Sequence, residues 1–162
     1  MFPTSSADIT KFKFADEKSR INFDLARKKL PDPILGFIPM VVINGPSGTG
    51  KSTLARHLAC EIQGRDATSL TSHEAPKSEG HWRTLLDHTA AHGDKVLLIQ
   101  GVSYLRAPQL EAFITSREWC YRVMHPQNYK RVPCETLVIV TGRKVTLSEA
   151  LNRRARIINL TL

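Results

Sequence analysis

The fold of this chain is decided by residues 40–63, which read MVVINGPSGTGKSTLARHLACEIQ. The stretch opens with four apolar residues, three of them β-branched, a pattern typical of a short buried strand. From residue 49 to residue 63, small or apolar side chains recur with helical spacing. They are Leu54, Ala55, Leu58, Ala59 and Ile62. A glycine-rich turn therefore joins a predicted buried strand to a predicted amphipathic helix.

The turn itself, residues 45–52, reads GPSGTGKS and matches the pattern G-x-x-x-x-G-K-[ST] throughout. Glycines let the backbone curl so that several amide groups point at one phosphate, and the helix that begins near Gly50 adds its positive end. Lys51 is expected to reach the β- and γ-phosphates, and the Ser52 hydroxyl to bind Mg²⁺. The pattern predicts a site for ATP or GTP with Mg²⁺. Its predicted binding residues are Gly45, Pro46, Ser47, Gly48, Thr49, Gly50, Lys51, Ser52 and Thr53.

Length and composition predict one globular domain. The chain has 162 residues, of which 41% are hydrophobic and 23% are charged, which excludes a disordered or collagen-like chain. No apolar run approaches the roughly 18 residues that span a bilayer, and residues 1–6 lack the blocks of a signal peptide. The three cysteines, Cys60, Cys120 and Cys134, lack metal-ligand spacing, which favours reduced thiols in a cytoplasmic protein.

Predicted strands and helices alternate along the chain. Continuous apolar runs predict buried strands over residues 95–100 and 136–141. Helices are expected over residues 16–29, 79–91, 108–114 and 147–154, and short strands over 68–71, 119–123 and 157–162. This alternation predicts an α/β fold of three layers with a mostly parallel central sheet.

Prolines and a glycine punctuate residues 31–38, which are therefore expected to form a connector. The predicted division is an N-terminal polar and helical extension, residues 1–35, followed by a nucleotide-binding domain, residues 36–162.

The net charge of +8 is concentrated after residue 95. Residues 96–162 hold only four acidic side chains against ten basic ones: Arg106, Arg117, Arg122, Lys130, Arg131, Arg143, Lys144, Arg153, Arg154 and Arg156. Such an excess favours a polyanionic partner, either nucleic acid or the phosphates of a nucleotide. A solvated basic face explains the charge equally well.

The end of the predicted strand 95–100 bears on whether the nucleotide is hydrolysed. Hydrolases need a carboxylate there, which holds the metal shell and orients the attacking water. This strand ends in Gln100 and Gly101, and Asp94 stands at its other end. Glutamine can accept a hydrogen bond from metal-bound water but brings no negative charge. Binding is therefore better supported than hydrolysis, and Glu79 is the best remaining candidate for a catalytic carboxylate.

Four segments in order resemble a known family. They are the phosphate loop, strand 95–100 with residues 110–115, residues 119–123, and residues 140–144 leading to 151–154. The order is similar to that of P-loop ATPase domains encoded by bacteriophages and integrated elements, often beside or fused to a primase and related to AAA+ proteins and superfamily-three helicases. The resemblance covers roughly residues 36–162. It implies a P-loop NTPase fold, ATP and Mg²⁺ as ligands, DNA or a replication protein as partner, and a homo-oligomeric ring.

The chain departs from that family at two places. Where the family has Asp-Asn, residues 100–101 are Gln-Gly, and where it has T-G-N-N, residues 141–144 read TGRK. The first change removes a carboxylate on the metal side, and the second replaces a polar amide with a cation. The resemblance therefore implies a diverged member with weak or lost hydrolysis.

The resemblance also places Arg153 and Arg154 where such ATPases carry an arginine finger that acts across a subunit interface. The alternative for both is ordinary surface pairing. The fold is expected to bring these two arginines and the pair Arg143-Lys144 toward the γ-phosphate side of the nucleotide.

Two other functions stay open from the sequence. One is a small-molecule or nucleotide kinase, because the loop is of the kind that guanylate kinases use, although acceptor-site residues have no convincing match. The other is a binding module in which the nucleotide is structural or absent. Asn44 is expected to be a turn residue, and His88 and His92 to be surface side chains rather than metal ligands.

Overall fold

The computed structural model describes residues 11–28, 39–64, 71–123 and 128–162. Its centre is a five-stranded sheet, all of whose strand pairs are parallel, in the order β2-β3-β7-β1-β9. These strands are β1 (Met40–Asn44), β2 (Ser72–Glu74), β3 (Val96–Gln100), β7 (Leu137–Gly142) and β9 (Ala155–Asn159). The helices are α1 (Glu17–Lys28), α2 (Lys51–Gln63), α3 (Glu79–Ala91), α4 (Pro108–Thr115) and α5 (Glu149–Asn152).

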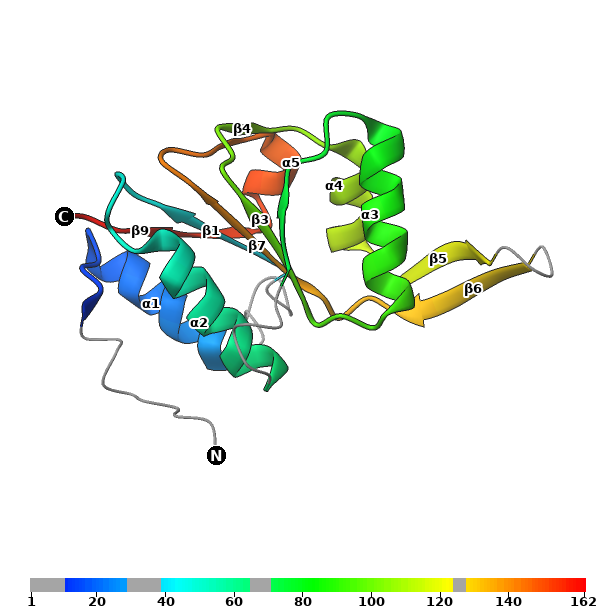
Figure 1. The fold of residues 1–162 in the computed structure, drawn as a ribbon, viewed down its shortest axis with the longest axis horizontal. Helices are drawn as coiled ribbons and strands as arrows, with labels where there is room; N and C mark the ends of the chain where they lie inside the picture. Colours follow the sequence, from blue (N-terminus) through cyan, green and yellow to red (C-terminus); the bar gives the residue numbers. More distant parts are fainter. Residues whose placement is uncertain (1–10, 29–38, 65–70, 124–127) are drawn as a thin grey trace.

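The helices cover both faces of the sheet (Figure 1). Because side chains alternate along a strand, β1 sends Val41 and Ile43 to the face covered by α1 and α2. It sends Met40 and Val42 to the face covered by α3 and α4. A strand buried on both faces needs a continuous apolar run, which is why β1, β3 and β7 were recognisable in the sequence. The prediction of a three-layer α/β fold with a parallel sheet is confirmed.

Most element predictions agree with the structure to within two residues at each end, and two expected strands differ more. The expected strand 157–162 corresponds to β9 at Ala155–Asn159. The expected strand 68–71 corresponds to β2 at Ser72–Glu74, and residues 68–70 lie outside the described residues. The expected helix 147–154 shortens to α5, because β8 (Thr146–Leu147) precedes it and β9 begins at Ala155. The connector predicted at 31–38 also lies outside the described residues.

The N-terminal helix α1 packs into the same core as the sheet. Phe23 and Ala26 are buried beside the strand residues of that face. The Asn22 side chain donates to the Ile157 carbonyl at 2.8 Å, and the Ser19 hydroxyl accepts the Asn159 amide at 2.9 Å. The predicted boundary between residues 35 and 36 falls outside the described residues and stays a prediction.

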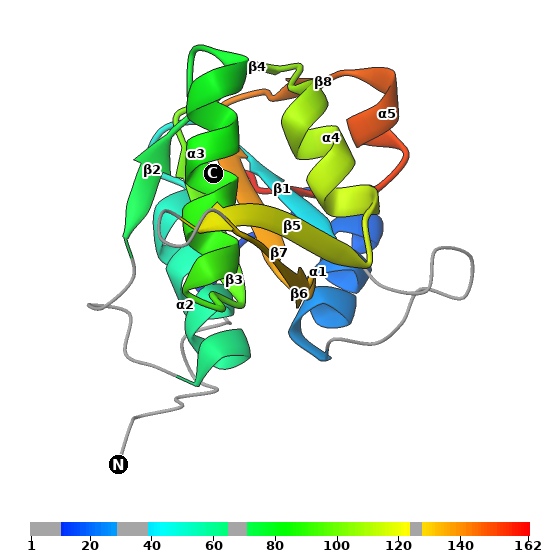
Figure 2. The ribbon, with the colours of Figure 1, turned by 90° about the vertical axis from the view of Figure 1, so that its right-hand side faces the viewer.

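A two-stranded antiparallel hairpin leaves the body of the molecule (Figures 1 and 2). Its strands are β5 (Glu118–Val123) and β6 (Asn128–Pro133). The sequence predicted the first strand but missed the second, because nearly all residues of β6 are exposed and show no apolar alternation. Trp119 at the base is the reason that the hairpin is fixed in place.

Trp119 is buried and makes three kinds of contact at the base of the hairpin. Its indole Nε1 donates to Asp87 Oδ1 at 2.8 Å, and its ring packs edge-on against Phe113 with centroids 5.1 Å apart. The Arg83 guanidinium lies 4.5 Å from the ring centroid and also pairs with Asp87 at 3.0 Å. Trp119 thus serves packing at the base of the hairpin.

Gly142 is the tightest backbone position at the carboxyl end of β7. A Cβ added there would lie 2.0 Å from the Val102 carbonyl oxygen and 2.7 Å from Val145 Cγ2. The neighbouring Val102 amide donates to the Thr141 carbonyl at 3.0 Å, so the two segments are held together. Glycine is therefore required by a close backbone approach.

We expect Gly142→Ala to lower the free energy of unfolding by about 3 kcal/mol, because the added methyl group has no space. Chemical denaturation measures this. Gly80→Ala is the matched control, since a Cβ at that helical position meets nothing within 4 Å and should leave stability unchanged or raise it by up to about 1 kcal/mol. Equal stability of the two variants would contradict the packing argument.

Candidate functional site

The candidate site lies at the carboxyl edge of the central sheet. The phosphate loop follows β1 there, and α2 begins at Lys51 (Figure 1). The ends of β3 and β7 share this edge, because all three strands run parallel. Open parallel sheets bind ligands outside the carboxyl ends of their strands.

Three glycines shape the loop, two through their backbone conformation and one through a close approach. Gly48 and Gly50 have φ values of 84° and 83°, in the left-handed region that side chains disfavour. A Cβ on Gly45 would lie 2.7 Å from Thr49 Oγ1. The loop is closed by Thr49, whose hydroxyl donates to the Pro46 carbonyl at 2.8 Å. The result is a tightly curled, glycine-rich turn of the kind that a phosphate site requires.

The first turn of α2 presents donors to this loop. Its N-cap residue, Gly50, has no side chain to occupy the free amides, and the turn carries no acidic residue. Lys51 Nζ donates to the Pro46 carbonyl at 3.0 Å, which sets the ammonium across the loop and leaves its other donors for phosphate oxygens. Ser52 and Thr53 follow as exposed hydroxyls. The geometry therefore agrees with the predicted phosphate contacts, which stay predictions until a nucleotide is bound.

Asn44 ties the phosphate loop to its neighbours. Its Oδ1 accepts the Val145 amide at 2.9 Å, and its Nδ2 donates to Asn159 Oδ1 at 3.3 Å. Its carbonyl accepts the Leu160 amide at 2.7 Å. Sequence reasoning treated Asn44 as a turn residue and missed this role. A polar residue ending an otherwise apolar strand was the signal.

The segment after β7 lies beside the loop. Gly45 N donates to the Gly142 carbonyl at 3.2 Å. Arg143 and Lys144 come directly afterwards and are exposed. The expectation that this basic pair lies at the edge where phosphates bind agrees with the structure.

Arg153 and Arg154 lie at the opposite edge. They precede β9, whose first residue, Ala155, pairs with Met40 at the start of β1. The expectation that the fold brings them toward the γ-phosphate side of the chain's own nucleotide is therefore wrong. Arg153 pairs with Glu149 at 2.5 Å on an exposed face, and Arg154 lines a cleft of about 570 Å³. A role across a subunit interface stays a prediction.

Gln100 ends β3 without an acidic neighbour on that strand. Its Nε2 atom is buried and has no hydrogen-bond partner. Glu79, the other carboxylate considered, accepts the Gln109 amide at 3.0 Å and so caps the start of α4. This contact gives Glu79 a structural role between two helices.

Among the described residues, the end of β3 and the first turn of α2 offer a Mg²⁺ ion only neutral ligands. The Ser52 hydroxyl fits the position beside the phosphates, and Gln100 can orient a water through its amide. Mg²⁺ is normally held through one or two carboxylates together with substrate phosphates. The described residues thus fit the phosphates of a nucleotide, and they fit the metal in part.

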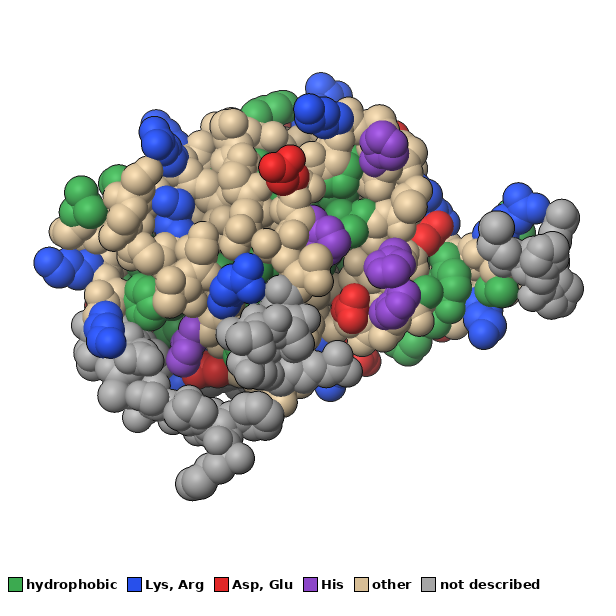
Figure 3. Space-filling view, viewed as in Figure 1, with side chains coloured by type: hydrophobic (Ala, Val, Ile, Leu, Met, Phe, Trp, Pro, Cys, Tyr) green, Lys and Arg blue, Asp and Glu red, His purple; other side chains and the backbone are tan. Residues whose placement is uncertain are grey.

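Histidines gather on the surface over α3 (Figure 3). The rings of His88 and His92 lie 4.0 Å apart, and His92 Nδ1 is 2.9 Å from the His88 carbonyl oxygen. Both are exposed, as expected. Within the described ranges, no group of three side chains suited to a metal was found.

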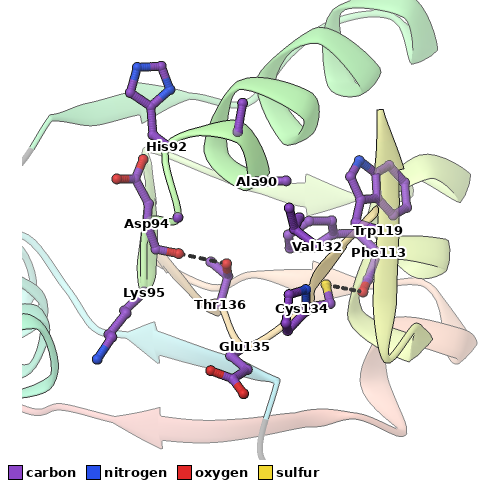
Figure 4. A pocket seen from close by; sticks show the side chains of 13 residues that line it. Ala90, His92, Asp94, Lys95, Phe113, Trp119, Val132, Cys134, Glu135 and Thr136 are labelled. Atoms are coloured by element: carbon purple, nitrogen blue, oxygen red, sulfur yellow. Dashed lines mark hydrogen bonds between the residues drawn. The ribbon is translucent and has the colours of Figure 1, made fainter. Parts of the chain in front are cut away.

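A second hollow, of about 380 Å³, lies at the amino edge of the sheet below the end of α3 (Figure 4). Cys134 is part of its wall. Its thiol donates to the Phe113 carbonyl at 3.2 Å, and burial raises its pKa to about 11. The charged ends of Asp94, Lys95 and Glu135 point in different directions, so these three side chains do not form a cluster.

The fold and the loop together define a P-loop NTPase fold. The chain matches the family model described as ATPase family associated with various cellular activities (AAA) over residues 41–161. This is well over half of its length, and the chain belongs to the AAA family. A search of curated proteins finds no match. Among the described residues, no helix is long and apolar enough to cross a membrane.

Membership of this family supports an ATP-binding AAA+ ATPase domain. It favours an ATPase over the kinase alternative, because the match runs from β1 to the residues after β9 and not over the loop alone.

We expect Lys51→Ala to abolish nucleotide binding while the fold is kept, because the ammonium donates to a carbonyl of the exposed loop and not into the core. Thermal unfolding with and without Mg-ATP measures this. Ligand at 100 times its dissociation constant stabilises the unaltered chain by about 2.7 kcal/mol, and the variant should show no shift. An equal shift in both would contradict the assignment of Lys51.

Proposed function

We propose that this chain is an ATP-binding P-loop ATPase domain of the AAA+ type, with GTP as the other nucleotide that the loop admits, in which hydrolysis is weak or lost. One observation supports the proposal that hydrolysis is weak or lost. The strand β3 ends in Gln100, on the face covered by α2, and no carboxylate follows directly. The phosphate loop beside it keeps every feature that binding needs. The chain is thus expected to bind ATP through the phosphate loop but to lack, at the end of β3, the carboxylate that hydrolysis needs.

The physical argument is one of charge. A neutral amide can orient a water molecule, but it does not add negative charge beside a divalent cation or withdraw a proton from the attacking water. Arg143 and Lys144 add positive charge at the same edge. A bound triphosphate is therefore held strongly by cations while the group that activates water is missing.

The proposed partner is DNA or a replication protein, in a bacteriophage or an integrated element. The family resemblance of the sequence supports the replication context. The hairpin supports a polyanionic partner, because it protrudes from the body and carries Arg122, Lys130 and Arg131 as exposed side chains, with Tyr129 68% exposed between them (Figures 1 and 3). Cations on an exposed ribbon suit contact with a phosphate backbone.

The proposed assembly is a homo-oligomer. Arg153 and Arg154 cannot reach the nucleotide of their own chain from the amino edge of the sheet. An arginine there can act only on a neighbouring subunit's nucleotide, as in the arginine-finger arrangement.

Gln100→Asp tests the loss of hydrolysis. We expect little Mg-ATPase activity from the unaltered chain and a clear gain in the variant, because the carboxylate returns to the strand end. Lys51→Ala is the blank. Activity already present in the unaltered chain and abolished by Lys51→Ala would refute the hydrolysis-deficient proposal.

The partner is tested with the hairpin. Exchanging Arg122 and Lys130 for glutamate should weaken DNA binding at low salt. It should also reduce the slope of log affinity against log salt by about 0.9 for each DNA phosphate that the variant no longer neutralises. Lys77→Glu, an exposed charge change in the turn before α3, is the control. Salt-independent absence of DNA binding by the unaltered chain would discard DNA as the partner.

A further inference from the structure

Glu74 ends β2 at the same edge of the sheet as the phosphate loop. The strands β2 and β3 pair in parallel, with Glu74 directly opposite Gln100. Neighbouring strands lie about 4.8 Å apart, a distance that an extended glutamate side chain spans. The end of β3 lacks a carboxylate, but the adjoining strand end carries one.

The two side chains project to the same face of the sheet. Val96 and Leu98 of β3 pack with the core residues of α2, so alternation places Gln100 on the α2 side as well. Residues in register on parallel strands share a face, which puts Glu74 there too. This is the face over which α2 begins, with Lys51 and Ser52 in its first turn.

Each of the two side chains lacks a partner. Gln100 Nε2 is buried without a hydrogen-bond acceptor. The Glu74 carboxylate is exposed and, among the described residues, makes no hydrogen bond or ion pair. A buried donor without an acceptor is costly, and a carboxylate on the next strand is the strongest acceptor available to it. The Gln100 amide donor and the Glu74 carboxylate acceptor are therefore complementary.

We propose that Glu74 on β2, and not a residue of β3, supplies the negative charge beside the divalent cation of bound ATP. In the proposed nucleotide-bound state, Gln100 donates its amide hydrogen to this carboxylate and fixes its direction, which makes Gln100 a positioning residue. The inference rests on the proposed nucleotide binding and adds the group that completes the metal side of the site.

A carboxylate at the end of β2 instead of the end of β3 is compatible with how Mg²⁺ is held in proteins. The ion usually keeps several of its waters, so a carboxylate can act through a bridging water rather than by direct contact. A carboxylate that arrives from β2 adds charge for binding but stands one strand away from where the group on β3 would orient an attacking water. Metal-dependent affinity and slow turnover are then expected together.

The test compares ATP affinity with Mg²⁺ and with EDTA, using a fluorescent ATP analogue, so that no turnover is needed. The proteins are the unaltered chain, Glu74→Gln, the double variant Glu74→Gln/Gln100→Glu, and the control Glu118→Gln, an exposed glutamate on the hairpin. We expect Glu74→Gln to reduce the gain in affinity that Mg²⁺ gives by about tenfold or more, the size of one hydrogen bond to a charged group. The affinity in EDTA should stay the same.

The double variant returns a carboxylate to the edge and should recover the Mg²⁺ gain, while Glu118→Gln should keep it throughout. Electron paramagnetic resonance of Mn²⁺ in place of Mg²⁺ should show weaker metal binding in Glu74→Gln at saturating ATP.

Two failures are distinguishable. If the unaltered chain binds ATP in a Lys51-dependent way and Glu74→Gln keeps the full Mg²⁺ gain, the role of Glu74 is refuted and the proposed binding function stands. If the unaltered chain binds no nucleotide in either condition, the proposed function and the role of Glu74 fail together.

Discussion

The structure depends on the contact between the end of β1 and the end of β7. Gly45 donates to the Gly142 carbonyl, and the Asn44 side chain holds Val145 on one side and Asn159 on the other. These bonds join three neighbouring strand ends through one short polar segment. These bonds fix the position of the phosphate loop, because a glycine-rich backbone does not hold one conformation by itself.

The sequence was enough to predict the central sheet and the phosphate loop. Strands buried on both faces must be continuously apolar, and the loop needs glycines at fixed positions, so both leave local patterns. The hairpin strand β6 left no such pattern because it faces solvent. The partnership of Glu74 and Gln100 depends on strand register between segments separated by α3, which no local pattern encodes.

The two edges of the sheet divide the chemistry. The carboxyl edge has the phosphate loop, the pair Arg143-Lys144 and the pair Glu74-Gln100. The amino edge has Arg154 and the root of the hairpin. Parallel strands impose this separation, because residues at the start and at the end of one strand cannot share a site. In the proposed homo-oligomer, head-to-tail contact between copies is the arrangement that would bring the arginines of one copy to the phosphate loop of the next.

The anchoring of Trp119 makes α3 the connection between the hairpin and the central sheet. Arg83 and Asp87 grip the hairpin in the middle of the helix, and α3 itself starts five residues after Glu74. The base of the hairpin is therefore anchored on a helix that follows closely after β2, the three-residue edge strand of the central sheet. The hairpin and the segment that carries the carboxylate proposed beside the nucleotide are thus connected through a single helix.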